Sequence, residues 1–213
     1  KKIAIDFIKQ RKDDRIGLVV FSGKSFTQCP PTLDKTTLVD LFNDIEEGNK
    51  MIDDGSTAIG DGLGTALNRL KDSKTKNKIV ILLTDGENTS GKISPLTAAD
   101  IAASDSVNIK VYTIGIGTKG MAKTPVSFYP EIGKYEYDYV EVNIDESTLT
   151  GIANKTGGKY FRATDNESLE GIYNTIDELE TSEIESVRFN TTTEKFYLFS
   201  LSALGVFLLS FIL

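Results

Sequence analysis

Residues 81–91, ILLTDGENTSG, place a carboxylate directly after a run of apolar and β-branched residues. Asp85 thus ends a predicted buried strand, although Asp-Gly is also common turn chemistry, because Gly86 can adopt a positive φ at little cost. A second oxygen donor, Thr57, precedes an apolar helical stripe and is equally suited to cap that helix. A hydroxyl and a carboxylate are the hard oxygen ligands that Mg²⁺ prefers. Two donors alone do not define a metal site.

The helix that follows Thr57 is unusually rich in glycine. DGSTAIGDGLGTAL, residues 54–67, carries Gly60, Gly62 and Gly64. Each glycine inside a helix costs up to about 1 kcal/mol relative to alanine. The better explanation is a close backbone approach of a neighbouring element. We therefore expect the start of this helix and the end of the strand at 78–84 to converge on one rim.

Several chemistries are excluded by composition. The 213 residues contain no histidine, which removes Ser-His-Asp and Cys-His catalysis and the commonest zinc ligand. The single cysteine, Cys29, has no such base beside it and fits a small buried thiol. The net charge of −7 argues against a nucleic-acid partner, which requires a basic patch.

Two short motifs resemble nucleotide-binding loops. GIGTKG at 115–120 matches G-x-G-x-x-G, but MAKTPVSFYP follows it instead of the helix that must hold the pyrophosphate. GKS at 23–25 lacks the required glycine at position 18, which is Leu18. A nucleotide-binding α/β enzyme therefore stays only as an alternative.

The elements that must position Thr57 and Asp85 alternate between strands and helices. We predict strands at 16–21, 25–32, 78–84, 109–117 and 159–163, and helices within 1–15 and at 34–48, 57–71, 94–105, 145–158 and 166–180. This alternation predicts an α/β fold with a doubly wound, mostly parallel sheet, whose sites lie at the carboxyl ends of strands. An aromatic hairpin is predicted within 128–145, where 133–142 forms a two-stranded excursion from the sheet that either contacts a partner or covers the core.

The last residues of the sequence are apolar and uncharged. Residues 196–213, FYLFSLSALGVFLLSFIL, carry no charge, which predicts a transmembrane helix. We expect a domain at 1–181, a juxtamembrane linker at 182–195 and the membrane helix at 196–213. At the other end, KKIAIDFIKQRKDDR enters a helix midway, so we expect an upstream segment.

The ordered segments FIKQRKDDRIGLVVFSG, DGSTAIGDGLGTALNRLK, KIVILLTDGENTSG and VYTIGIGT strongly resemble a von Willebrand factor type A domain over about residues 1–180. With TGGKYFRATDNESLEGIYNTIDELE and the trailing apolar segment, the sequence is similar to the bacterial aerotolerance (Bat-type) membrane proteins. The resemblance implies a Rossmann-like von Willebrand factor A fold. The first central strand of that fold would precede Lys1, so we expect a gap between the strands at 16–21 and 79–84.

The same resemblance implies a metal-ion-dependent adhesion site (MIDAS). In that family the site is built from an Asp-x-Ser-x-Ser loop, a Thr and an Asp. Thr57 matches the Thr and Asp85 the Asp of TDG, and the remaining ligands are expected upstream of Lys1. The implied cofactor is Mg²⁺ or another divalent cation in the full-length protein, bound weakly or not at all by residues 1–213. Ser56, Glu87 and Asn88 are expected at the partner-binding rim because they adjoin the two ligands.

The function implied is a non-enzymatic, membrane-anchored interaction module in an aerotolerance- or stress-related envelope complex. A carboxylate of a protein partner would complete the metal coordination. The resemblance implies a bacterial cell membrane location, with the domain on the periplasmic side. A metal-free structural scaffold of the same fold is the main alternative.

Overall fold

A computed structural model describes residues 1–45, 55–73, 75, 77–117, 120–129, 134–142 and 144–189. The chain divides into two units, residues 1–174 and residues 175–213. Thr57 and Asp85 lie in the first unit, which contains every described strand.

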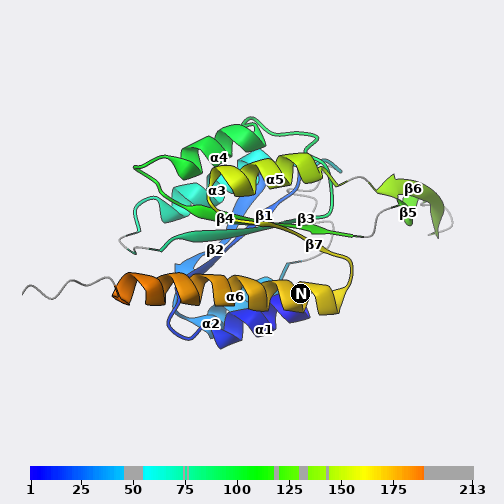
Figure 1. The fold of residues 1–213 in the computed structure, drawn as a ribbon. Helices are drawn as coiled ribbons and strands as arrows, with labels where there is room; N and C mark the ends of the chain where they lie inside the picture. The colour runs from blue at the N-terminus through cyan, green and yellow to red at the C-terminus, as the bar shows by residue number, and fades with distance from the viewer. Residues whose placement is uncertain are drawn as a thin grey trace, which may run out of the picture. The chain divides into compact units, whose positions relative to one another are not determined.

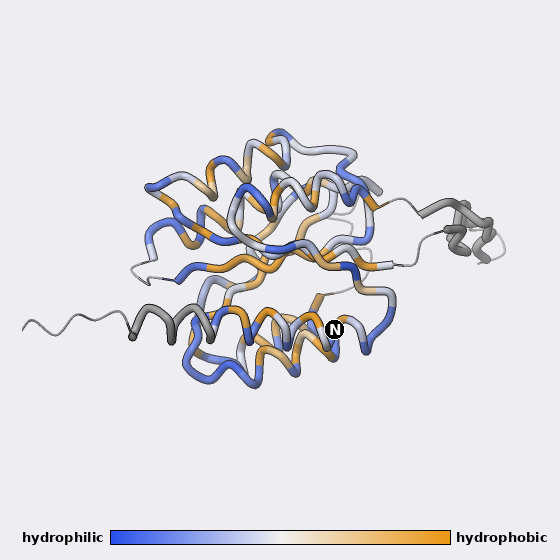
Figure 2. Tube along the Cα trace, viewed as in Figure 1, coloured by the Kyte–Doolittle hydropathy of each residue, from blue (hydrophilic) through white to orange (hydrophobic). Residues whose placement is uncertain are grey.

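Two sheets form the centre of the first unit. β1 (Ile16–Phe21) and β2 (Ser25–Thr32) lie where strands were predicted and pair as an antiparallel hairpin. β3 (Ile79–Thr84), β4 (Lys110–Ile116) and β7 (Tyr160–Ala163) form a parallel sheet in the order β3-β4-β7. Apolar residues follow these strands through the domain (Figure 2). The predicted α/β class with parallel strands is therefore confirmed.

A break separates the two sheets where the gap was predicted. Among the described strands, β3 pairs only with β4 and β1 only with β2. Each of β1 and β3 therefore has one edge without a strand partner among the described residues. Backbone groups at such an edge need hydrogen-bond partners, so this position is suited to receive one more strand.

Helices cover both faces of the sheets (Figure 1). α3 (Ile59–Leu70), α4 (Pro95–Ala103) and α5 (Glu146–Lys155) lie on one face, and α1 (Lys2–Gln10) and α2 (Lys35–Asn43) on the other. α6 (Asn166–Phe189) begins beside α1, where Tyr173 stacks on Phe7 with ring centroids 4.5 Å apart.

The core places α3 against both sheets. Its predicted stripe is inward: Ile59, Leu63 and Leu67 are buried, and Ala66 and Leu70 pack partly buried against the same cluster. That cluster includes Val80 and Leu82 of β3 and Phe21, the last residue of β1. α3 therefore bridges the break between the sheets.

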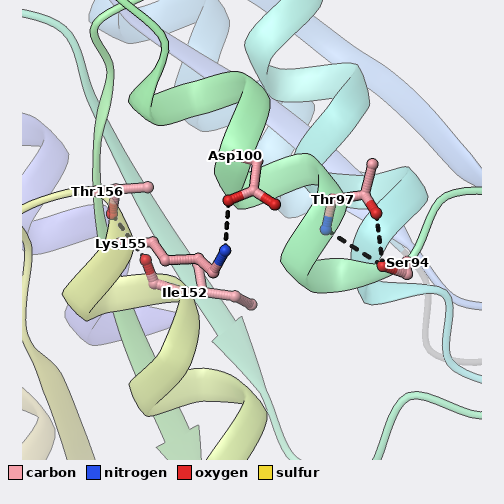
Figure 3. Close-up of polar contacts among 6 residues, drawn as sticks. All are labelled: Ser94, Thr97, Asp100, Ile152, Lys155 and Thr156. Atoms are coloured by element: carbon pink, nitrogen blue, oxygen red, sulfur yellow. Dashed lines mark hydrogen bonds and ion pairs between the residues drawn. The ribbon is translucent and has the colours of Figure 1, made fainter.

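The helix ends largely follow their sequence signals. The side chains of Asp34, Ser94 and Asp145 cap α2, α4 and α5, and Pro95 is the first residue of α4. Figure 3 shows the ion pair that joins Lys155 of α5 to Asp100 of α4. It also shows the C-terminal end of α5, where Thr156 Oγ1 donates to the carbonyl of Ile152 at 2.9 Å. α2 ends at Asn43, before the predicted stop at Gly48, which lies outside the described residues.

The predicted hairpin differs in extent. β5 (Gly120–Tyr129) pairs antiparallel with β6 (Lys134–Val142), so residues 133–142 supply one strand and not two. The hairpin itself is confirmed, but the prediction that 133–142 holds both of its strands was wrong, because β6 pairs along its length with residues 120–129. The motif GIGTKG therefore leads into a strand, which removes the helix that a dinucleotide site needs.

The C-terminal region is described only in part. α6 continues to Phe189, beyond the predicted domain end at 181 and into the predicted linker at 182–195. The predicted transmembrane helix at 196–213 lies outside the described residues. Within the residues that are described, no helix combines the length and the apolar character needed to cross a membrane.

Candidate metal centre

The structure brings the loops of Thr57 and Asp85 together. Asp85 directly follows the end of β3 and is exposed, and Thr57 lies two residues before α3. A Cβ atom added to Gly86 would lie 3.3 Å from Thr57 Oγ1. The Thr57 hydroxyl and Gly86, the residue next to the carboxylate, are therefore neighbours although they are 29 positions apart in the sequence.

This contact also corrects the expected role of Gly86. The described glycines with positive φ are Gly55, Gly91, Gly117 and Gly157, so Gly86 is not used for a left-handed turn. Its value is the space it leaves beside the Thr57 hydroxyl. The turn itself is closed by Thr84, whose Oγ1 lies 3.3 Å from the backbone N of Gly86 and donates to its carbonyl.

Three hydrogen bonds fix the backbone of Thr57. Its carbonyl accepts from the N–H groups of Thr89 at 2.9 Å and Ser90 at 3.1 Å. Its own N–H donates to Thr89 Oγ1 at 2.9 Å. The segment that follows Asp85 therefore holds the other predicted ligand in place.

The start of α3 is capped from outside the helix. The interpretation of Thr57 as a plain N-cap was wrong: the N-cap is Ala58, which has no side-chain cap of its own. The N–H of Ile59 donates instead to Asn88 Oδ1 at 2.8 Å, and the N–H of Ala58 to the carbonyl of Ser22 at 2.7 Å. The Thr57 hydroxyl is thereby left for another role.

The predicted rim residues divide by exposure. Glu87 is exposed, whereas Ser56 and Asn88 are half-buried. Ser56 Oγ donates to Ser90 Oγ at 2.9 Å, and its carbonyl accepts from Ser22 Oγ at 2.8 Å. Ser56 and Asn88 thus brace the two loops, and Glu87 presents a second carboxylate beside Asp85.

The glycines of α3 allow a close approach, as predicted. A Cβ on Gly60 would lie 1.9 Å from the carbonyl oxygen of Ile93, and one on Gly62 would lie 2.7 Å from Cγ of Phe21. Sequence reasoning missed Asp61 between them, whose carboxylate accepts from the N–H groups of Lys92 and Ile93. An acidic residue enclosed by two such glycines was the available signal.

Thr57 and Asp85 carry the type of donor atom that a hard divalent cation binds. A threonine hydroxyl and an exposed carboxylate are oxygen ligands, and Glu87 adds negative charge nearby. In the described part of the chain, no three His, Cys, Asp or Glu side chains converge as a metal-binding group. The two oxygen donors of Thr57 and Asp85 are fewer than a hard divalent cation needs from its surroundings.

Comparison with known proteins identifies the family. The von Willebrand factor type A domain family matches residues 1–175, and the chain belongs to this family. An uncharacterized protein of Borreliella burgdorferi is 34% identical over 172 residues, covering 80% of this chain and 48% of that protein. A UPF0353 protein of Nocardia farcinica is 26% identical over 179 residues, covering 76% and 50%. The chain spans about half the length of these curated relatives.

Solved structures show the same fold. BatB of Bacteroides thetaiotaomicron has a TM-score of 0.68 at 24% identity, covering 84% of this chain and 86% of its own. An aerotolerance-related membrane protein of Bacteroides fragilis has a TM-score of 0.65 at 23% identity, covering 82% and 84%. Proximal thread matrix protein 1 of the mussel byssus, in a structure with a zinc-occupied MIDAS motif, has a TM-score of 0.58 at 22% identity, covering 84% and 40%.

Proposed function

We propose that this domain is a metal-dependent protein-interaction module held at a bacterial membrane. The observation that carries the proposal is the convergence of the Thr57 and Asp85 loops, with Gly86 leaving space beside the Thr57 hydroxyl. Thr57 and Asp85 would hold Mg²⁺ or another divalent cation, and the remaining ligands are expected from residues that precede Lys1.

The bound cation would supply an electrophilic centre for a carboxylate of the protein partner. The chain's own residues orient that site: Asn88 and Thr89 fix the Thr57 segment, and the exposed Glu87 lies at the edge. Ser56, Glu87 and Asn88 stay our candidates for the partner-binding side, with Glu87 the residue best exposed to touch a partner. A charge-assisted bond of this kind gains strength when the partner excludes water.

Two further observations support a bacterial envelope location. The solved proteins of similar fold include one described as an aerotolerance-related membrane protein. Residues 196–213 have the uncharged length of a membrane helix. We therefore place the module in an aerotolerance- or stress-related envelope complex, with the domain on the periplasmic side.

Site-specific photo-crosslinking tests this function. A photoreactive residue at Glu87, in the full-length protein in its native membrane, should capture a protein partner in Mg²⁺ and lose it in EDTA. The same group at the exposed Asp40 on α2 is the control and should capture no metal-dependent partner. Capture at Glu87 that persists in EDTA would favour the metal-free scaffold. Displacement of the partner by a nucleotide would favour the enzyme alternative.

A further inference from the structure

We propose that Asp61 is a positioning residue that clamps the Asp85 loop to the first turn of α3 and so holds the two metal-binding loops in register. This role rests on the proposed metal site and extends it to a residue outside the ligand set. Asp61 lies four positions after Thr57, on the helix that Thr57 precedes.

The Asp61 carboxylate is engaged by backbone donors. Its Oδ1 accepts from the N–H of Lys92 and from the N–H of Ile93, each at 2.9 Å. Its Oδ2 also lies 3.1 Å from the Lys92 nitrogen. Hydrogen bonds from backbone N–H groups to a carboxylate are about twice as strong as bonds between neutral groups. Both oxygens thus contact the loop backbone, which is the basis for assigning Asp61 a positioning role.

Glycines let the backbone pack closely around this clamp. Gly60 is pressed against the Ile93 carbonyl, as described above. Gly91 adopts a φ of 112°, and a Cβ there would lie 3.4 Å from Asp61 Cγ and 3.3 Å from the Cβ of Ala58. A conformation of this kind strains any residue with a side chain. The chain thus uses glycine on both sides of the Asp61 carboxylate.

Asp61 attaches the Asp85 loop to α3 at the end of the loop that lies away from Asp85. Nearer Asp85, Asn88 and Thr89 bond the backbone of residues 57–59. Asp61 makes the corresponding bonds at residues 92 and 93, just before α4. Because the loop between them is attached at both ends, loss of the Asp61 bonds should loosen the contacts to Thr57 as well. Removing a residue that orients ligands typically lowers metal affinity by about 10- to 100-fold.

Hydrogen exchange on the full-length protein without metal tests the clamp. In Asp61→Ala we expect protection of the Lys92 and Ile93 amides to fall at least about tenfold, and protection of the Thr89 and Ser90 amides to fall with it. Asp61→Asn retains an Oδ1 acceptor for both bonds and should keep most of the protection. Unchanged protection at Thr89 and Ser90 in Asp61→Ala would overturn the coupling.

Metal affinity provides the second readout. In a calorimetric titration with Mn²⁺, Asp61→Ala should weaken binding by about tenfold or more, and Asp61→Asn by much less. Asp34→Ala is the matched control, because it removes the same charge and a similar backbone-capping bond on α2. Equal affinities of Asp61→Ala and Asp34→Ala would overturn the positioning role. Absence of Mn²⁺ binding by the unaltered protein would instead overturn the proposed function, and the exchange result would still decide whether the clamp exists.

Discussion

Gly86 makes room for the Thr57 hydroxyl, and this space can be tested directly. In Gly86→Ala the new methyl group would lie 3.3 Å from Thr57 Oγ1, so the hydroxyl or the loop must shift by a few tenths of an ångström. Metal sites require ligands held within roughly 0.5 Å of the productive position. We expect the metal affinity of the full-length protein, measured by calorimetry, to fall several-fold while the domain stays folded.

The control for this prediction is another glycine-to-alanine change. A Cβ on Gly171 in α6 would meet no atom within 4 Å, so Gly171→Ala should leave metal affinity unchanged. Because Gly171 lies in a helix, the substitution should raise stability by up to about 1 kcal/mol. A Gly86→Ala protein with the affinity of the unaltered protein would contradict the assigned role of Gly86.

Asn88 caps α3 from a neighbouring loop, and its loss should cost stability. In Asn88→Ala the N–H of Ile59 loses its acceptor at 2.8 Å. Loss of an N-cap acceptor typically lowers the free energy of unfolding by about 1 kcal/mol. Asn88→Asp retains an acceptor oxygen, so its free energy of unfolding, measured with urea, should fall much less. Equal losses in the two variants would show that the cap is not the cause.

At the scale of elements, the cap of α2 makes the stability depend on pH. Bonds from the Thr37 hydroxyl at 2.7 Å and the Thr37 backbone N–H at 3.0 Å hold the pKa of Asp34 below its usual value. A carboxylate with a lowered pKa contributes stability at pH values above its unfolded pKa, and this contribution is lost as the pH falls through its folded pKa. Carboxylate NMR titration should find the lowered pKa.

Unfolding at several pH values provides the matching stability measurement. Asp34→Asn keeps a capping oxygen and removes the ionisable group, so its stability should depend less on pH below about 4 than that of the unaltered protein. Identical pH dependences of the two proteins would contradict the assignment.

Local sequence signals predicted the elements whose causes are local. Ser94 and Pro95 open α4 as their types require, and the apolar run before Asp85 forms β3. The periodic stripe of α3 is also buried as expected. In each case the residues that decide the structure are adjacent or separated by one helical turn.

The same reasoning failed where distant residues decide. Thr57 precedes α3 but does not cap it. The N–H of Ile59 donates to Asn88 and the N–H of Ala58 donates to the carbonyl of Ser22, and both acceptors lie on other loops. The strand partner of residues 134–142 was likewise misjudged, because pairing depends on the chain's return path. Asp61 was missed for a related reason: the glycines beside it indicate a close approach, but not that the approaching groups are the N–H groups of Lys92 and Ile93.

At the scale of the whole molecule, the uncharged segment 196–213 predicts whether the protein is found in the supernatant or in the membrane fraction. A chain ending near Thr193 lacks this segment and should stay in the supernatant without detergent, whereas the chain through Leu213 should require detergent. Ultracentrifugation of cell fractions measures the difference. A chain through Leu213 that behaves as a detergent-free monomer would contradict the membrane anchor.

The break between β1 and β3 connects the fold to the metal site. We expect an upstream strand to fill this position and its following loop to supply the missing ligands. Hydrogen exchange should therefore show β1 and β3 amides better protected in the upstream-extended chain than in residues 1–213, because the unpaired edge of each strand then gains a partner.

Calorimetric titration with Mg²⁺ of these two chain lengths tests the central claim most directly. Thr57 and Asp85 alone are too few ligands to hold Mg²⁺ against its hydration shell, so residues 1–213 should bind weakly or not at all. The upstream-extended chain should bind clearly, and Asp85→Ala in that chain should abolish binding. Tight binding by residues 1–213 would place the ligands elsewhere. Absence of binding by the extended chain, or binding that survives Asp85→Ala, would contradict the metal-dependent function and favour a scaffold of the same fold.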